Sequence, residues 1–160
     1  MTILLLSLSI STAHAGKLAA GWRGRPFGPS DTIATAPGDS CAPSPEAGVR
    51  WRCSELVGGA PVIVSYMVEE DTFASVLISC DGFSACSVVV ETLGAAWGRP
   101  FSTESYGMLP DRFWQDGGSI GSWSYNEFSK EGYAVAADTG LLGKVKAAKA
   151  ARARSAADDL

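Results

Sequence analysis

The chain has 160 residues, of which 46% are hydrophobic and 19% are charged, and its formal net charge is −4. A chain of this length is typical of one domain and buries about 70% of its unfolded surface, so it can build a core of its own. The mildly acidic charge excludes a general affinity for nucleic acid, which requires a dense basic face.

Residues 1–15 predict export. They form an apolar run that ends in the small-residue triplet Ala13-His14-Ala15, which is the pattern of a cleaved secretory signal peptide. The run is too short to span a bilayer, and no later apolar run has the length of a transmembrane segment. It lacks the usual cationic start, so the alternative is a buried N-terminal strand or helix of a cytosolic protein. We expect a periplasmic or secreted protein that loses its only histidine on cleavage.

The segment that follows, 16–54, is rich in Gly, Pro, Ser and Ala and shows no clear periodicity. We therefore predict a loop-like segment, with at most a short strand at 49–53, ahead of a single α+β domain at 55–160. Residues 22–27 (WRGRPF) resemble residues 97–101 (WGRPF). A tandem duplication would explain the likeness, but the sequences that follow the two copies do not match, which favours shared turn chemistry or coincidence.

Two groups of strands are predicted. Runs at 62–68 and 73–80 are rich in β-branched residues and each has an apolar face, so with the polar turn between them they form a hairpin at 62–80. Aromatic runs separated by Gly-containing turns predict a three-stranded meander at 112–137. The expected fold class is α+β, with an antiparallel sheet.

Two helices are expected to pack on this sheet. The first, at about 84–97, has apolar residues at three- and four-residue spacing and Ser84 as its N-cap. The second, at about 141–155, can be capped by Asp138 or Thr139, and its apolar stripe is thin in the second half. The predicted order is therefore hairpin, helix, meander, helix.

The second predicted helix is basic, whereas the rest of the chain is acidic. Residues before Lys144 sum to −7, from eight basic and fifteen acidic residues. Five cations then fall within eleven residues: Lys144, Lys146, Lys149, Arg152 and Arg154. Such a helix could touch anionic lipid or an acidic partner. The alternative is a solvated face, which the alanine-rich apolar side of the helix favours.

Four cysteines allow three disulfide pairings, and their spacing favours the two local ones. We predict Cys41–Cys53, which would tie down the Pro/Gly-rich segment, and Cys80–Cys86, which would fix the corner between strand and helix. Each bond would stabilise the fold by about 2–3 kcal/mol. The alternative is a zinc site, but the spacings lack the paired C-x₂₋₄-C knuckles of such sites. We expect neither a metal nor a cofactor.

The sequence contains no recognisable catalytic set, so we expect the protein not to be an enzyme. The mature chain would have no histidine, and no serine lies in a G-x-S-x-G or S-x-x-K motif. No glycine-rich phosphate-binding loop is present either. Carboxylates are the remaining route to catalysis, since a glycosidase needs two of them about 5–10 Å apart. Glu104, Asp111 and Asp116 lie in predicted loops, but no motif singles out a pair.

Binding of another macromolecule is the leading hypothesis, with an envelope protein or a glycan as the partner. Aromatic residues crowd into 113–133, and an exposed aromatic face could bind a glycan or anchor a protein. The candidate contacts are Trp114, Trp123, Tyr125 and Tyr133. The alternative is that these aromatic residues form the core between sheet and helix. A secreted hydrolase inhibitor that uses the acidic turn 69–71, and a small carboxylate-dependent glycan hydrolase, remain as alternative functions.

One stretch resembles a known pattern. The predicted hairpin leads into a helix that ends in LGAAWGRP at 93–100. This arrangement resembles uncharacterised small exported proteobacterial α+β proteins, in which a helix ending in L-x-x-x-aromatic-G-x-P leads back into strands. Those proteins are loosely similar to outer-membrane assembly lipoproteins and to β-lactamase-inhibitor-like domains. The anchoring cysteine of the lipoproteins is missing here, and inhibitor-like domains place their helices before the strands. No functional residue is carried over.

Overall fold

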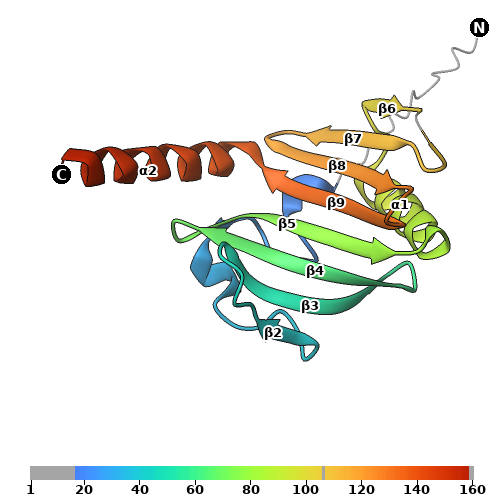
Figure 1. Cartoon of the computed structure of the whole chain (residues 1–160), viewed down its shortest axis with the longest axis horizontal. Coiled ribbons are helices and arrows are strands. Elements are labelled where there is room, and N and C mark those ends of the chain that lie inside the picture. The colour runs from blue at the N-terminus through green and yellow to red at the C-terminus, as the bar shows by residue number, and fades with distance from the viewer. Residues whose placement is uncertain (1–16, 106, 159–160) are drawn as a thin grey trace, which may run out of the picture.

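Nine strands form one antiparallel sheet, which confirms the α+β fold class (Figure 1). The computed structural model describes residues 17–105 and 107–158, and the expected signal peptide at 1–15 lies outside them. The sheet order is β2-β3-β4-β5-β9-β8-β7-β6, with β1 pairing with β5 off this path. The strands are β1 (Gly28–Pro29), β2 (Cys41–Pro43), β3 (Val49–Val57), β4 (Ala60–Glu69), β5 (Thr72–Asp81), β6 (Ser102–Glu104), β7 (Asp111–Asp116), β8 (Ser119–Asn126) and β9 (Glu131–Asp138). The helices are η1 (Lys17–Ala20), η2 (Ser30–Ile33), α1 (Phe83–Trp97) and α2 (Thr139–Asp158).

The predicted hairpin consists of β4 and β5. Their alternate residues point into the core, and Val64, Tyr66 and Val76 are at most 1% exposed. The two residues between the paired ends of the strands, Glu70 and Asp71, both have positive φ, at 48° and 53°. Positive φ at both central positions is characteristic of the turn whose twist matches an antiparallel pair. The predicted meander corresponds to β7, β8 and β9.

The segment 16–54 contributes more to the fold than its composition predicts. β3 continues across residues 54 and 55 and pairs with β4 along its length. Leu18 and Ile33 are fully buried in the same core as the rest of the chain. The described part of this segment and the residues after it therefore share one core.

The helix α1 covers one face of the sheet and lies against β3, β4, β5, β8 and β9. It buries Cys86, Val89, Val90, Leu93 and Trp97. The prediction of Ser84 as its N-cap is wrong, because the helix already begins at Phe83 and the cap is Gly82, whose φ is 81°. The chain leaves β5 through a left-handed residue, a conformation that glycine adopts readily.

Both predicted disulfides are confirmed. Cys41–Cys53 joins the neighbouring strands β2 and β3, where the two cysteines are directly paired. Cys80–Cys86 joins the end of β5 to the first turn of α1. Cys53 and Cys86 are fully buried, so these bonds also contribute to the core.

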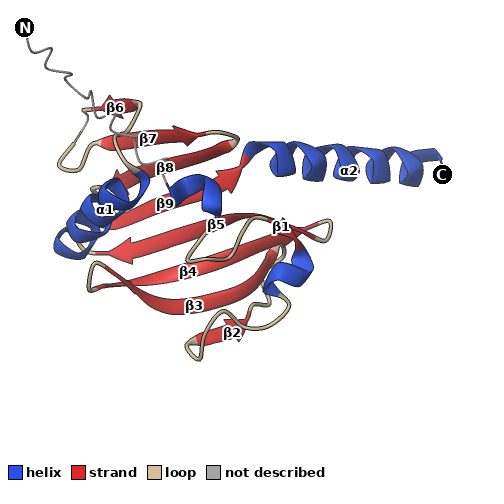
Figure 2. Ribbon diagram, turned by 180° about the vertical axis from the view of Figure 1, so that it is seen from behind, coloured by secondary structure: helices blue, strands red, loops and turns tan. Residues whose placement is uncertain are grey.

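The helix α2 projects from the sheet rather than packing across it (Figures 1 and 2). Asp138 caps it by accepting a hydrogen bond from the Leu141 amide at 2.9 Å, as one of the two predicted caps. Val145 is 5% exposed, but the side chains of residues 149–156 are exposed. Only the first turns are buried because the apolar stripe of the helix continues as alanine. Its middle is held by two ion pairs to the β4–β5 turn, Lys149–Glu69 and Arg152–Glu70.

In each half of the sheet, the strands follow one another in chain order from the outer edge to the centre. Four strands and then a helix occur twice along the chain, as β2 to β5 with α1 and as β6 to β9 with α2. The two series meet at the central pair of β5 and β9. The two similar segments, 22–27 and 97–101, each precede one series. The sequence likeness therefore coincides with a structural repeat, although the sequence alone favoured coincidence.

Candidate functional site: the open face of the sheet

Within the described residues, no helix lies across the central strands on one face of the sheet. Figure 2 shows α1 and η1 in front of the sheet, and Figure 1 shows the same sheet from the other side. Residues that alternate with the buried ones on β3, β4, β5 and β9 point to this second side. They line a hollow of about 880 Å³. We call this surface the open face and define it by six residues: Arg52, Ile63, Leu77, Asp81, Glu131 and Tyr133.

At the centre of the open face, apolar side chains lie among serines, since Leu77 pairs with Ser65 and Ile63 pairs with Ser79. Ile63 and Leu77 are partly exposed there, and Met67 continues the apolar patch along β4. Tyr133 is 37% exposed and lies in register with Ser79, which in turn pairs with Ile63. The exposed side of a one-sided antiparallel sheet normally carries polar residues. Partly exposed aliphatic side chains on such a side favour an interaction surface.

Two carboxylates lie at one end of the open face. Asp81 and Glu131 are directly paired across β5 and β9, so their side chains are neighbours on one surface. Like charges in this position destabilise a sheet. Within the described residues, neither carboxylate has a Lys or Arg nitrogen within 4.0 Å. This pair therefore does not stabilise the isolated domain, which favours a role in recognition.

The tyrosine and the arginine of the open face are only loosely held. The hydroxyl of Tyr133 donates a hydrogen bond to Glu131 at 2.7 Å, and this bond raises the pKa of the exposed phenol. Arg52 lies on β3, on the other side of the apolar centre. Its Nη1 is 4.0 Å from Glu46 Oε2, and both side chains are more than half exposed. Such an exposed pair contributes little to stability, so Arg52 is free to meet another anion.

The aromatic residues predicted as contacts do not form one surface. Trp114 and Trp123 are each 1% exposed and belong to the core. Tyr125 is half-buried on the same side as Trp123 and packs edge-on against Phe83. Tyr133 pairs with Ser124 rather than with Trp123 or Tyr125, so it points to the opposite side of the sheet. Of the four predicted contacts, Tyr133 alone lies on the open face.

The other residues of the open face were missed by sequence reasoning, although a signal for them exists. The strand prediction used the alternation of the buried positions and left Ile63, Met67 and Leu77 without a partner. Apolar residues on both sides of a strand indicate that both sides make contacts. Asp81 lies outside the predicted strand at 73–80, whereas it is the last residue of β5.

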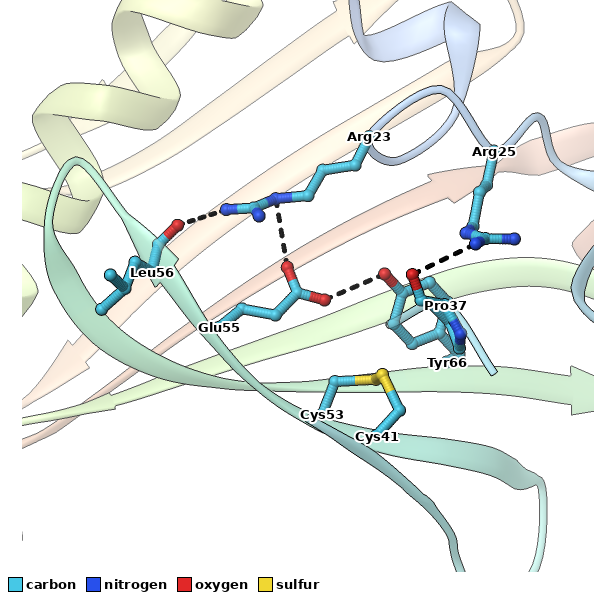
Figure 3. A network of polar contacts seen from close by, with 8 residues as sticks. All are labelled: Arg23, Arg25, Pro37, Cys41, Cys53, Glu55, Leu56 and Tyr66. Atoms are coloured by element: carbon cyan, nitrogen blue, oxygen red, sulfur yellow. Dashed lines mark hydrogen bonds and ion pairs between the residues drawn. A yellow bond between two sulfur atoms is a disulfide. The ribbon is translucent and has the colours of Figure 1, made fainter. Parts of the chain in front are cut away.

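A second polar cluster lies at the edge of the sheet and serves the fold (Figure 3). Glu55, with a side chain 10% exposed, is 3.1 Å from the Nε of Arg23 and accepts a hydrogen bond from the Tyr66 hydroxyl at 3.0 Å. The Arg23 guanidinium also donates to the carbonyl of Leu56. The two contacts of Arg23 attach the segment 22–27 to β3, and the Tyr66 hydrogen bond joins β3 to β4. Glu55 Oε2 is at ion-pair distance from Arg23 but has no hydrogen bond within the described residues, and because the cluster joins elements of the fold we assign it a structural role.

This cluster is expected to make the free energy of unfolding fall as the pH rises into the alkaline range. Burial raises the pKa of the Tyr66 phenol, and the neighbouring Glu55 raises it further. The folded state therefore retains the Tyr66 proton above the unfolded pKa of about 10, so this stability is present below that pH and is lost above it. We expect the free energy of unfolding to fall by up to about 1.4 kcal/mol per pH unit above pH 10.

Urea unfolding of the wild type and of Tyr66→Phe between pH 8 and 11.5 would measure this effect. The variant is expected to lose the part of the alkaline slope that Tyr66 causes, whereas Tyr133→Phe, at an exposed position, keeps that part. An unchanged slope in Tyr66→Phe would exclude Tyr66 as its origin.

The residues that would carry the two alternative functions, hydrolase inhibition and glycan hydrolysis, lie outside the open face. In the acidic turn, Glu69 and Glu70 pair with Lys149 and Arg152 of α2, and the side chain of Glu70 is only 15% exposed. They are therefore not free to enter the active site of a hydrolase. Glu104 and Asp111 pair across β6 and β7, and Asp116 accepts a hydrogen bond from the amide of Ala19 at 3.2 Å. None of these three carboxylates lines the hollow of the open face.

Other findings bear on the setting of the site. Among the described residues, no three His, Cys, Asp or Glu side chains are grouped as metal ligands would be. No helix within 17–105 or 107–158 is both long enough and apolar enough to cross a membrane. The two disulfides fit an oxidising compartment. Comparison of the chain with protein-family models, with curated proteins and with solved structures gave no match.

Proposed function

We propose that this protein is a non-enzymatic domain of the cell envelope, periplasmic or secreted, that acts by binding another macromolecule through its open face. The observation that carries this proposal is the group of partly exposed aliphatic side chains on the sheet, which lies in a hollow beside two carboxylates that have no cationic partner among the described residues. Contiguous apolar surface rimmed by polar groups is the usual form of a recognition surface.

An envelope protein fits the open face better than a glycan does. Ile63 and Leu77 are aliphatic and suit the apolar side chains of a protein, and apolar cores with polar rims are typical of protein interfaces. A glycan site would need aromatic platforms, and Tyr133 is the one aromatic residue among the six that define the face. We therefore favour a protein partner that has apolar and cationic groups side by side.

The role proposed here is binding rather than hydrolysis. Asp81 and Glu131 are the two carboxylates among the six residues of the open face, and both are exposed on an open sheet surface. A glycosidase places its two carboxylates on either side of a bound sugar and excludes water from the site. Neighbouring side chains on one exposed surface do not enclose a substrate in this way.

Substitution of Leu77 by lysine tests the proposal. The tagged exported protein would be used to recover partners from envelope extract, in parallel with Leu77→Lys and with the control Phe101→Lys. Phe101 is 70% exposed and lies beside β6, at the far edge of the sheet. We expect recovery of the partner to fall at least tenfold for Leu77→Lys, because an unpaired charge would be buried at the centre of the interface. The control is expected to behave as the wild type.

Two results would contradict the proposal. One is a partner that Leu77→Lys recovers as well as the wild type does, since that partner must use another surface. The other is a loss of recovery that is equal in Leu77→Lys and Phe101→Lys. Circular dichroism of each variant would verify that the fold is intact, which is expected because both side chains lie outside the fully buried core.

A further inference from the structure

The open face has the geometry of one half of a β-sandwich. Two sheets pack face to face at a distance of about 10 Å, and the apolar side chains of their inner faces interdigitate. Ile63, Met67 and Leu77 would occupy such an inner layer, but a single copy supplies only one sheet. A second sheet of matching size and pattern is available on every other copy of this chain.

The charges of the open face are arranged so that the face complements itself. Arg52 lies on β3, in register with Ser65 and Leu77. Asp81 lies two strands away and four residues further along β5, next to Glu131. The cation and the two carboxylates are therefore on opposite sides of the apolar centre. A two-fold axis in the plane between two such faces exchanges these positions, and it places each Arg52 against the carboxylates of the other copy.

We propose that two copies of this protein associate through their open faces about a two-fold axis. In the complex, Ile63 and Leu77 of both copies form the shared apolar layer. Arg52 of each copy pairs with Asp81 and Glu131 of the other, so the contact occurs twice, as in all two-fold interfaces. The paired carboxylates, which repel each other in the single copy, thereby acquire a cation.

The size of the face limits how tight this dimer can be. Four strands of about eight residues, at about 4.8 Å between strands and about 3.4 Å per residue, span about 500 Å² in each copy. The total of about 1,000 Å² is at the lower limit of specific interfaces. We therefore expect a reversible dimer with a dissociation constant in the micromolar range. The dimer and the envelope partner would compete for one surface, so the partner binds the single copy.

Charge reversal combined with mixing tests the proposal. Sedimentation velocity of the mature protein from about 1 to 500 µM would be compared with Arg52→Glu, with Asp81→Lys and with an equimolar mixture of the two. In Arg52→Glu alone, like charges meet at both contacts. In Asp81→Lys alone, the introduced lysine opposes Arg52 of the other copy and neutralises the neighbouring Glu131, so we expect dimerisation to weaken at least tenfold in each variant. In the mixed dimer, the introduced glutamate of one copy meets the introduced lysine of the other, while the native Arg52 and Asp81 meet at the second contact. We therefore expect the mixture to recover the affinity of the wild type.

The control is Lys146→Glu, which changes the net charge by the same amount as Arg52→Glu but lies on the exposed helix α2. It is expected to leave dimerisation unchanged. A wild type that stays monomeric up to the highest concentration would overturn the proposal, and so would a dimer that both Arg52→Glu and Asp81→Lys retain. The first of these results, together with a partner that Leu77→Lys still loses, would leave the proposed function standing without the dimer.

Discussion

Replacement of Trp123 by alanine is expected to lower the free energy of unfolding by about 3–5 kcal/mol. The side chain is 1% exposed and lies at the centre of the core, where the position of a Cβ atom on Gly132 would be 2.4 Å from its Cη2 atom. Truncation removes the whole indole and leaves a cavity that neighbouring strands cannot fill by a small movement. Urea unfolding of the wild type and the variant would measure the difference.

This result would distinguish the structural role of Trp123 from a role in binding. A loss of that size is a large part of the total stability of a typical domain, which is about 5–15 kcal/mol. Phe128→Ala is the control, since that side chain is 99% exposed and its removal is expected to change stability by no more than about 0.5 kcal/mol. A Trp123→Ala variant as stable as the wild type would contradict the placement of this residue in the core.

The second large effect is expected at Gly132, which lies on β9 against the Cys80–Cys86 disulfide. A Cβ atom there would meet Trp123 Cη2 at 2.4 Å, Cys80 Sγ at 2.8 Å and Cys86 Sγ at 3.0 Å. An indole in the core and a disulfide cannot move aside cheaply, so Gly132→Ala is expected to cost about 3 kcal/mol through overpacking. Urea unfolding again provides the measurement.

A matched control and a second background make this prediction specific. Gly38→Ala adds the same methyl group where no atom lies within 4 Å, and we expect stability to change by no more than about 0.5 kcal/mol. In a Trp123→Leu background, the smaller side chain makes room, so the additional cost of Gly132→Ala should fall by more than half. Equal costs of Gly132→Ala in both backgrounds would mean that Trp123 is not what the new methyl group meets.

The features that sequence reasoning predicted correctly depend on residues close together in the chain. The hairpin follows from alternation within two adjacent runs, and α1 follows from spacing over four turns. The pairings Cys41–Cys53 and Cys80–Cys86 join residues twelve and six positions apart. The cap is Gly82 and not Ser84, because the direction of the chain after β5 decides where the helix begins. The presence of a hydroxyl at position 84 does not decide it.

The features that escaped prediction depend on pairings between distant residues. The central pair of β5 and β9 joins Asp81 to Glu131, and this contact creates the acidic end of the open face. The register of β8 and β9 decides that Tyr133 faces away from Trp123. A shift of one residue in a strand reverses every side chain, so a local pattern cannot assign such faces. The open face itself follows from the course of α2, whose exposed half leaves the sheet uncovered.

The candidate site could be found only in part, because it too depends on contacts between distant residues. The sequence showed the aromatic cluster, and burial then placed Trp114 and Trp123 in the core. It did not show that the acidic turn at Glu69 and Glu70 is held by α2, because that contact spans about half of the chain. Tyr133 is the residue on which the sequence prediction and the open face agree.

Site-specific photo-crosslinking in intact cells tests the central claim most directly, since it asks which surface of the protein is in contact with another macromolecule. A photoreactive phenylalanine derivative would replace Leu77 on the open face or Phe101 at the far edge of the sheet. We predict that the protein labelled at Leu77 forms a covalent adduct of higher mass on irradiation, whereas the protein labelled at Phe101 does not. Adducts from Phe101 with none from Leu77 would contradict the assignment of the open face as the binding surface.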